Sequence, residues 1–149
     1  MQIEKTTAKR LYDESPKWFQ EQMEKEFGKE FFQKKAFKDI KSFEDACKAL
    51  GIDHKKVMNP NEQEDIIAYK KLVIIIRAIN QGWKPNWNNS SEKKWWPWFN
   101  LSSGFGFSSS YYYDASTGAT VGSRLCFESQ EKCDYAATQF IDIYKSFLT

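Results

Sequence analysis

The feature that most constrains the fold of this chain is a long apolar helix predicted over residues 62–80. Acidic residues stand in its first turn, where the helix dipole favours them, and Gly82 follows its expected end. Apolar side chains cover far more than one stripe of its surface: Ile66, Ile67, Tyr69, Val73, Ile74, Ile75 and Ile76. Because a helix that is apolar over so much of its girth usually lies inside a core, we expect the chain to pack around it. The alternative is that one side of this helix contacts another protein.

Short helices are expected before the central helix. The first begins near Pro16 and ends at Gly28. The second covers residues 43–50, with Ser42 as its N-cap and Gly51 after its last turn. A serine hydroxyl suits the N-cap because it accepts a bond from a first-turn N–H, and glycine tolerates the left-handed backbone that often ends a helix.

The pattern changes after residue 82, where aromatic and β-prone residues replace the helical periodicity. Three strands are predicted, over residues 94–101, 104–113 and 120–127, with a hairpin loop between the last two. Residues 129–148 return to helical spacing and should cover the sheet.

Together these elements predict one α+β domain over residues 1–149. A helical N-terminal half, about residues 1–82, contains the central buried helix. Residues 83–149 are expected to form a three-stranded antiparallel meander covered by a C-terminal helix. A chain of 149 residues has the usual size of a single domain, and no segment resembles a linker.

The charge of the chain argues against a protein that grips duplex DNA mainly through its phosphates. The chain has 22 basic and 20 acidic residues, a formal net charge of +2. Phosphate-driven binders usually show a clear basic surplus. Most basic residues are lysines, so only Arg10, Arg77 and Arg124 offer a planar, two-pronged donor.

Cysteine usage and the distribution of apolar residues predict a cytoplasmic protein. Cys47, Cys126 and Cys133 form no CxxC pair and cannot all be paired, which is typical of free thiols in a reducing compartment. The polar N-terminus does not resemble a signal peptide, and the longest apolar stretch, residues 72–76, is far too short to cross a membrane. No membrane partner is therefore expected.

The sequence contains no recognisable catalytic motif, so we expect a protein that is not an enzyme and uses no cofactor or metal. The single histidine, His54, lies in a polar stretch, and the common metalloprotease, nucleophile-elbow, phosphate-loop and dinucleotide-binding motifs do not occur. Cys126 alternates with apolar residues and is interpreted as part of the core. An enzyme is the third alternative, and it requires an unforeseen cluster around Cys126, His54 or paired carboxylates.

Tryptophan density is the most unusual feature of the sequence. Five of the six tryptophans fall in one short segment: Trp83, Trp87, Trp95, Trp96 and Trp98. Because neighbouring strand residues point to opposite faces, part of this set is expected on the side of the sheet away from the helices. One interpretation is that the rings fill a core and cover a sheet. The other is a stacking platform for bases, with nearby cations at the phosphates, although an exposed aromatic patch also suits a protein partner.

Two arginines stand in apolar surroundings, Arg77 in the central helix and Arg124 in the predicted third strand. A buried arginine needs an anion beside it. The anion is either an internal carboxylate, such as Asp134 or Asp142, or the phosphate or carboxylate of a ligand.

Four motifs of the chain resemble a known family. They are FEDACKALG at 43–51, INQGWKPNW at 79–87, WPWF at 96–99 and GSRLCF at 122–127. In this order they are similar to a family of small uncharacterised proteins encoded by bacteriophages and prophages of Bacteroides-type gut bacteria. The resemblance covers about residues 15–148. It implies a phage origin and the cytoplasm of the host bacterium, and it assigns no catalytic or binding residue.

We therefore predict a non-catalytic binding protein whose ligand is a nucleotide or a single-stranded nucleic acid. The rings expected to stack and the cations expected at phosphates are Trp87, Trp95, Trp96, Trp98, Tyr112, Lys84, Lys94 and Arg124. The alternative is a protein-interaction module that uses the same aromatic surface to bind a host or phage protein or to self-associate. Salt separates the two, because only phosphate-driven binding weakens steeply as salt is added.

Overall fold

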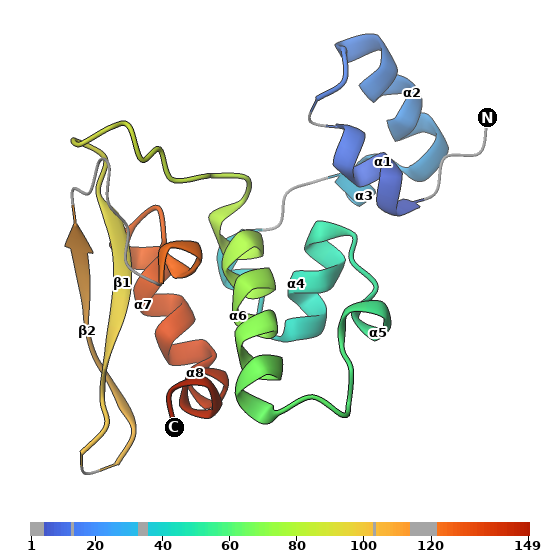
Figure 1. Ribbon diagram of the computed structural model, residues 1–149. Coiled ribbons are helices and arrows are strands. Elements are labelled where there is room, and N and C mark those ends of the chain that lie inside the picture. Colours follow the sequence, from blue (N-terminus) through green and yellow to red (C-terminus); the bar gives the residue numbers. More distant parts are fainter. Residues whose placement is uncertain (1–4, 13, 33–35, 103, 114–121) are drawn as a thin grey trace.

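The computed structural model describes residues 5–12, 14–32, 36–102, 104–113 and 122–149, and it confirms the predicted α+β class (Figure 1). Helices make up most of the described chain, and an antiparallel pair of strands stands at one side of the molecule. In chain order the elements are α1 (Lys5–Tyr12), α2 (Lys17–Phe27), α3 (Lys29–Phe32), η1 (Phe37–Asp39), α4 (Phe43–Leu50), α5 (His54–Val57), α6 (Glu64–Asn80), β1 (Lys94–Asn100), β2 (Gly106–Tyr113), η2 (Ser123–Leu125), α7 (Gln130–Gln139) and α8 (Ile141–Leu148).

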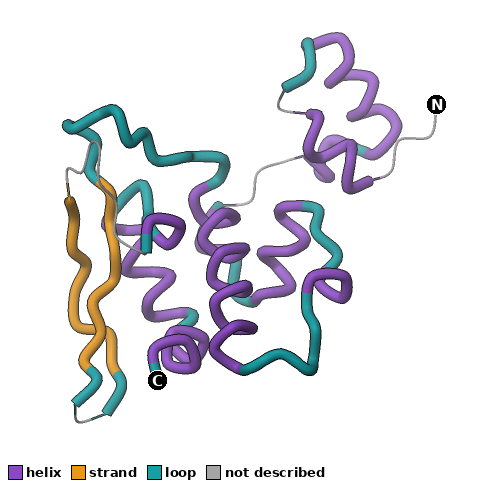
Figure 2. The backbone as a smooth tube through the Cα atoms, in the orientation of Figure 1, coloured by secondary structure: helices purple, strands orange, loops and turns teal. Residues whose placement is uncertain are grey.

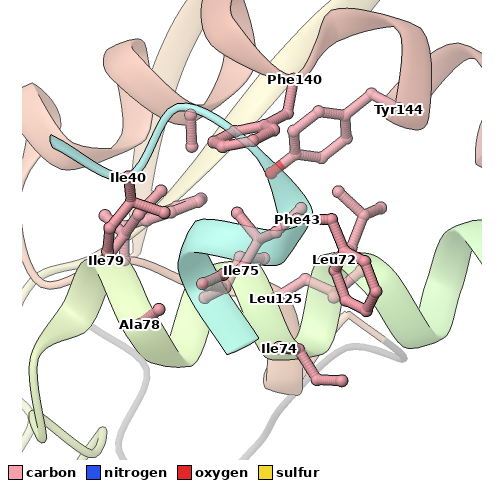
Figure 3. Close-up of a cluster of buried hydrophobic side chains, with 14 of the residues drawn as sticks. Ile40, Phe43, Leu72, Ile74, Ile75, Ala78, Ile79, Leu125, Phe140 and Tyr144 are labelled. Carbon is pink, nitrogen blue, oxygen red and sulfur yellow. The ribbon is translucent and has the colours of Figure 1, made fainter. Parts of the chain in front are cut away.

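Helix α6 is the central buried helix that the sequence predicts. It lies between α4 and α5 on one side and α7 and α8 on the other (Figures 1 and 2). Its most deeply buried aliphatic side chains are Leu72, Ile75, Ile76 and Ile79. Figure 3 shows members of this group in one buried cluster with Phe43 of α4 and the pair formed by Phe140 and Tyr144. The apolar side chains of α6 therefore pack against neighbouring helices on both sides, as expected for a helix in the core.

The predicted helix ends before α6 are confirmed. The hydroxyl of Ser42 accepts a hydrogen bond from the Asp45 N–H at 3.1 Å, so Ser42 is the N-cap of α4. Gly51 follows α4 with φ of 67° and ψ of 33°, in the left-handed region that favours glycine. Gly28, with φ of 87°, follows the last residue of α2, where the sequence predicts the end of this helix.

Helices α1, α2 and α3 share an aromatic cluster near the N-terminus. The rings of Tyr12 and Phe32 are stacked with centroids 4.2 Å apart, and those of Phe27 and Phe31 are 5.5 Å apart. The Tyr12 hydroxyl also donates to the Glu24 carboxylate. Helix α2 matches the predicted first helix, whereas α1 was not predicted because its sequence shows too few apolar residues to reveal a helical period.

The sheet contains two of the three predicted strands. β1 and β2 match the strands predicted over residues 94–101 and 104–113, and they pair antiparallel. The third strand is not confirmed: residues 120 and 121 lie outside the described residues, and the chain then forms η2, in which the Leu125 N–H donates to the Gly122 carbonyl at 2.8 Å. That bond uses a backbone donor that a strand ladder would need. Within the described residues, Phe127 pairs with β1 in an isolated bridge with Trp95.

The predicted C-terminal helix is divided into α7 and α8. Ser129 is the N-cap of α7, as the predicted start at residue 129 requires. Phe140 interrupts the helix with φ of −112° and ψ of 29°. Just before it, the Thr138 hydroxyl donates to the Asp134 carbonyl, a contact that competes with the helical ladder and bends helices. The two helices cover one side of the hairpin and of α6 (Figure 1).

Candidate functional site

The pairing register of the hairpin divides its side chains between two faces. Paired residues of an antiparallel sheet lie on the same face, and neighbours along a strand lie on opposite faces. Trp96 pairs with Tyr111 and Trp98 pairs with Ser109, so these four residues define one face, which we call the outer face. The pairs that alternate with them define the inner face: Trp95 with Tyr112, Pro97 with Ser110, and Phe99 with Phe107.

The inner face is turned toward α7 and α8. The Ser110 hydroxyl donates to the carboxylate of Asp134 in α7. The ring of Phe99 lies with its centroid 4.7 Å from that of Tyr144 in α8. Trp95 and Phe99 both pack against the buried core. The inner face of the hairpin is therefore a structural surface.

The outer face carries exposed aromatic rings. The Trp98 side chain is 63% exposed and that of Tyr111 is 42% exposed. Their ring centroids are 6.3 Å apart, and the planes are inclined by 65°. Trp96 is half-buried, and its indole Nε1 donates to the Gly122 carbonyl at 2.9 Å. We call Trp96, Trp98 and Tyr111 the outer aromatic surface.

The aromatic residues predicted to form one site are thus divided between both faces. Trp96 and Trp98 lie on the outer face, as the alternation predicts, whereas Trp95 and Tyr112 lie on the inner face with ring centroids 4.9 Å apart. Tyr112 stays at the margin of the inner face, 42% exposed, with the Lys93 ammonium 4.4 Å from its ring centroid.

Tyr111 and Lys93 were not among the predicted site residues. The signal that identifies Tyr111 is the pairing register, in which it lies opposite Trp96. That register contains a bulge, since Trp98 and Phe99 are neighbours in β1 but pair with Ser109 and Phe107 in β2. A bulge at this place cannot be read from the alternation of residues in one strand. The sequence therefore identified the hairpin but not the tyrosine that shares the outer face with Trp98.

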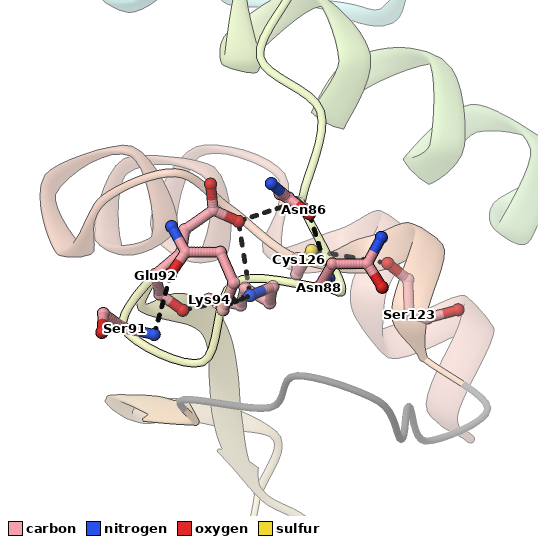
Figure 4. Close-up of polar contacts among 8 residues, drawn as sticks. Asn86, Asn88, Ser91, Glu92, Lys94, Ser123 and Cys126 are labelled. Atoms are coloured by element: carbon pink, nitrogen blue, oxygen red, sulfur yellow. Dashed lines mark hydrogen bonds and ion pairs between the residues drawn. The ribbon is translucent and has the colours of Figure 1, made fainter.

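Lys94 and Trp87 form a different contact, inside the loop before β1. The Lys94 side chain is completely buried. Its ammonium lies 3.3 Å from the Glu92 carboxylate, 3.1 Å from the Glu92 carbonyl and 3.4 Å from the Asn89 carbonyl (Figure 4). It also lies 5.2 Å from the ring centroid of Trp87. Lys94 thus fixes the loop to β1, and its ammonium does not face solvent.

The remaining predicted cations, Lys84 and Arg124, are exposed. Arg77 is exposed as well, so neither arginine forms the buried ion pair with Asp134 or Asp142 that was one alternative. Arg124 lies in η2, two residues after Gly122, whose carbonyl is bonded to Trp96. This connection places the backbone of η2 beside the outer aromatic surface.

The segment around the hairpin is locally basic although the whole chain is nearly neutral. Residues 83–127 contain four basic side chains, Lys84, Lys93, Lys94 and Arg124, and two acidic ones, Glu92 and Asp114. The Glu92 carboxylate forms an ion pair with Lys94 and accepts a hydrogen bond from the Asn86 N–H at 2.8 Å. Among the described residues of this segment, the exposed charges outside the Lys94–Glu92 pair are those of Lys84, Lys93 and Arg124, and they are positive, which favours an anionic ligand.

The thiols have no features of a nucleophilic site. Burial raises the pKa of Cys126 to about 11 and that of Cys133 to about 12. A reactive thiol needs the opposite shift, toward the thiolate. The Cys126 thiol donates to the Ser123 carbonyl at 3.4 Å rather than to a base (Figure 4). All three cysteines are buried and unpaired, as the core interpretation predicts.

Two further features of the described residues bear on possible ligands. Among them, no group of three or more histidine, cysteine, aspartate or glutamate side chains could hold a metal ion. No helix in the described part of the chain has the length and apolar character needed to cross a membrane. Comparison of the chain with protein-family models, curated proteins and solved structures gave no match.

Proposed function

We propose that the protein is a non-catalytic binding protein whose outer aromatic surface binds single-stranded nucleic acid or free nucleotides. The observation that carries this proposal is the exposure of Trp98, 63%, beside an exposed Tyr111 in a locally basic segment. Neighbouring aromatic rings in solvent are common in surfaces that bind a ligand or a partner, and this supports a binding role for Trp98 and Tyr111.

The chemistry of this surface suits bases and phosphates together. Ring faces hold the faces of bases, and an unpaired strand or a free nucleotide offers such faces, whereas a duplex hides them between base pairs. Arg124 supplies a planar guanidinium that can bind a phosphate through two donors. Lys84 adds positive charge in the same segment, whereas the Lys93 ammonium lies over Tyr112 of the inner face. Lys94 does not belong to this set because its ammonium is buried.

The second edge of β2 favours the second candidate, a protein-interaction module. Within the described residues β2 is hydrogen-bonded only to β1, so its other edge lacks a partner strand. The strand GFSSSYYY contains no charge and no proline, the usual devices that protect an edge. Because it is neutral, β2 can pair with β2 of a second copy without charge repulsion. Self-association is therefore the form of this alternative that we favour.

The resemblance to phage proteins remains a prediction about origin. A place in the cytoplasm of a bacterial host is part of the same proposal. It is supported by the three buried free thiols, which suit a reducing compartment.

The proposal is tested by fluorescence anisotropy of a labelled oligothymidylate titrated with the protein at several salt concentrations. We expect saturable binding that weakens with salt. Arg124→Ala should lower the affinity and reduce the salt exponent by about 0.7, the value for one lost phosphate contact on a single strand. Lys55→Ala is the matched control, since Lys55 is exposed on α5, on the opposite side of α6 from the hairpin (Figure 1).

Two outcomes contradict the nucleic-acid proposal. One is a flat titration for the oligothymidylate and for a panel of nucleotides. The other is an affinity that neither salt nor Arg124→Ala changes. If light scattering then shows a mass that doubles as the protein concentration rises, the self-association module becomes the better account.

A further inference from the structure

The spacing of the outer aromatic surface bears on the size of its ligand. Trp96 and Trp98 are two residues apart on one strand, which places their Cα atoms about 6.6 Å apart along the sheet. Tyr111 lies opposite Trp96 on the neighbouring strand, with its ring centroid 6.3 Å from that of Trp98. The surface is therefore an extended row of rings and not a slot around one ring.

The angle between the two exposed rings decides how bases can use them. The planes of Trp98 and Tyr111 are inclined by 65°. A planar base can lie parallel to one of these rings only, because a ring pair that encloses a single base must be nearly parallel and about 7 Å apart, twice the contact distance of carbon atoms. One nucleotide therefore leaves the face of the other ring in water. Two successive nucleotides can cover both.

Positive charge lies toward one end of this row. Arg124 follows Gly122 by two residues, and the Gly122 carbonyl accepts a hydrogen bond from Trp96. At the other end, beyond Trp98, the exposed residue Leu101 carries no charge. A bound strand would therefore meet positive charge near Trp96 and uncharged residues near Trp98. This arrangement favours few phosphate contacts and a larger share of stacking.

We infer that the outer aromatic surface takes a short single strand of at least two successive nucleotides in preference to a mononucleotide. This inference rests on the proposed function and specifies the ligand of the same site. Trp98 and Tyr111 then each stack on a separate base, and Arg124 contacts the phosphate region at the Trp96 end. The salt dependence should correspond to one or two phosphates, with an exponent of about 0.7–1.4.

The test is a length series measured by quenching of tryptophan fluorescence. The probes are thymidine 5′-phosphate, the dinucleotide TpT and oligothymidylates of up to about ten nucleotides, a length within the usual site size of single-strand binders. We expect the affinity to rise about tenfold from the mononucleotide to the dinucleotide, which is about 1.4 kcal/mol. Beyond a few nucleotides the affinity should rise only because a longer strand offers more equivalent positions at which it can bind.

Variants show which ring causes the gain in affinity from the mononucleotide to the dinucleotide. Trp98→Ala and Tyr111→Ala should each remove the gain from the mononucleotide to the dinucleotide, because one ring face is then missing. Ile66→Ala is the matched control, since Ile66 is an exposed apolar residue of α6 and does not belong to the hairpin. Its length series should equal that of the wild type.

The outcomes distinguish the inference from the proposed function. Equal affinities for the mononucleotide and the dinucleotide would overturn the inference while leaving the proposed function intact. A length dependence that survives Trp98→Ala would also overturn it, because the gain would then come from phosphates. The absence of binding at every length would overturn both proposals.

Discussion

Helix α6 and the β1–β2 hairpin are both rich in large apolar side chains, but α6 buries most of them whereas the hairpin leaves some exposed to solvent. In α6 the buried residues include Leu72, Ile75, Ile76 and Ile79. In β1 the only fully buried side chain is that of Lys94, while Trp98 is mostly exposed. The helix therefore contributes to stability, and the outer face of the hairpin adds little to it. The predictions below test this division, beginning with the largest expected effect.

Leu72→Ala should have the largest effect on stability. Leu72 is completely buried at the centre of the core, and removing its branched end leaves a cavity. We expect the free energy of unfolding to fall by about 2–5 kcal/mol in a denaturant titration. Ile66→Ala on the same helix is the control, and it should change this free energy by less than about 0.5 kcal/mol because Ile66 is exposed. Similar losses in the two variants would contradict the central position of α6.

Asn80→Ala should have the next largest effect, because Asn80 joins α6 to the segment beyond η2. Its buried amide donates to the Cys126 carbonyl at 3.0 Å and accepts from the Glu128 N–H at 3.1 Å. Alanine leaves both backbone groups without this partner, at an expected cost of about 1–3 kcal/mol in the free energy of unfolding. Asn88→Ala, at an exposed loop position, should be nearly neutral in the same titration.

Tyr144→Phe should leave the free energy of unfolding unchanged or raise it by up to about 1 kcal/mol. The Tyr144 hydroxyl is buried, and within the described residues it has no hydrogen-bond partner. Burial also raises its pKa well above the ordinary value. Tyr135→Phe is the contrasting variant, because the Tyr135 hydroxyl donates to the Ile40 carbonyl at 2.9 Å. The free energy of unfolding of Tyr135→Phe should fall by about 1 kcal/mol. A fall of the same size in Tyr144→Phe would show that the Tyr144 hydroxyl is hydrogen-bonded.

Trp98→Ala should have the smallest effect on stability. The Trp98 ring is exposed and rests mainly against Tyr111, so we expect the free energy of unfolding to change by less than about 0.5 kcal/mol. Thermal unfolding followed by circular dichroism measures this change. A loss as large as that of Leu72→Ala would mean that the outer face belongs to the core after all, and the division between helix and hairpin would be wrong.

Local signals made α6, the caps of α4 and the two strands of the hairpin predictable. Ser42 and Gly51 act through bonds to their own helix, and the burial of α6 follows from its apolar girth. The prediction of a strand over residues 120–127 was not confirmed, because the β-like composition of this segment competes with a local turn at Gly122. Such competition is decided by tertiary contacts, and a single sequence does not contain them.

The candidate site was predictable only in its location. The tryptophan segment identified the hairpin, and the strand alternation correctly predicted that part of the aromatic set lies on the side away from the helices. The roles of Tyr111 and Lys94 depended on a bulge in β2 and on the fold of an irregular loop. The exposure of Arg124 was not predictable, because apolar neighbours in the sequence do not imply burial when the chain forms a short surface turn.

The most direct test of the account is the affinity of a single-stranded oligothymidylate for the wild type and for Trp98→Ala under the same conditions. Because one stacked base contributes about 1–3 kcal/mol, we predict that Trp98→Ala binds about five- to 150-fold more weakly while its thermal unfolding is unchanged. Equal affinities of the two proteins, or no binding by the wild type, would contradict the account.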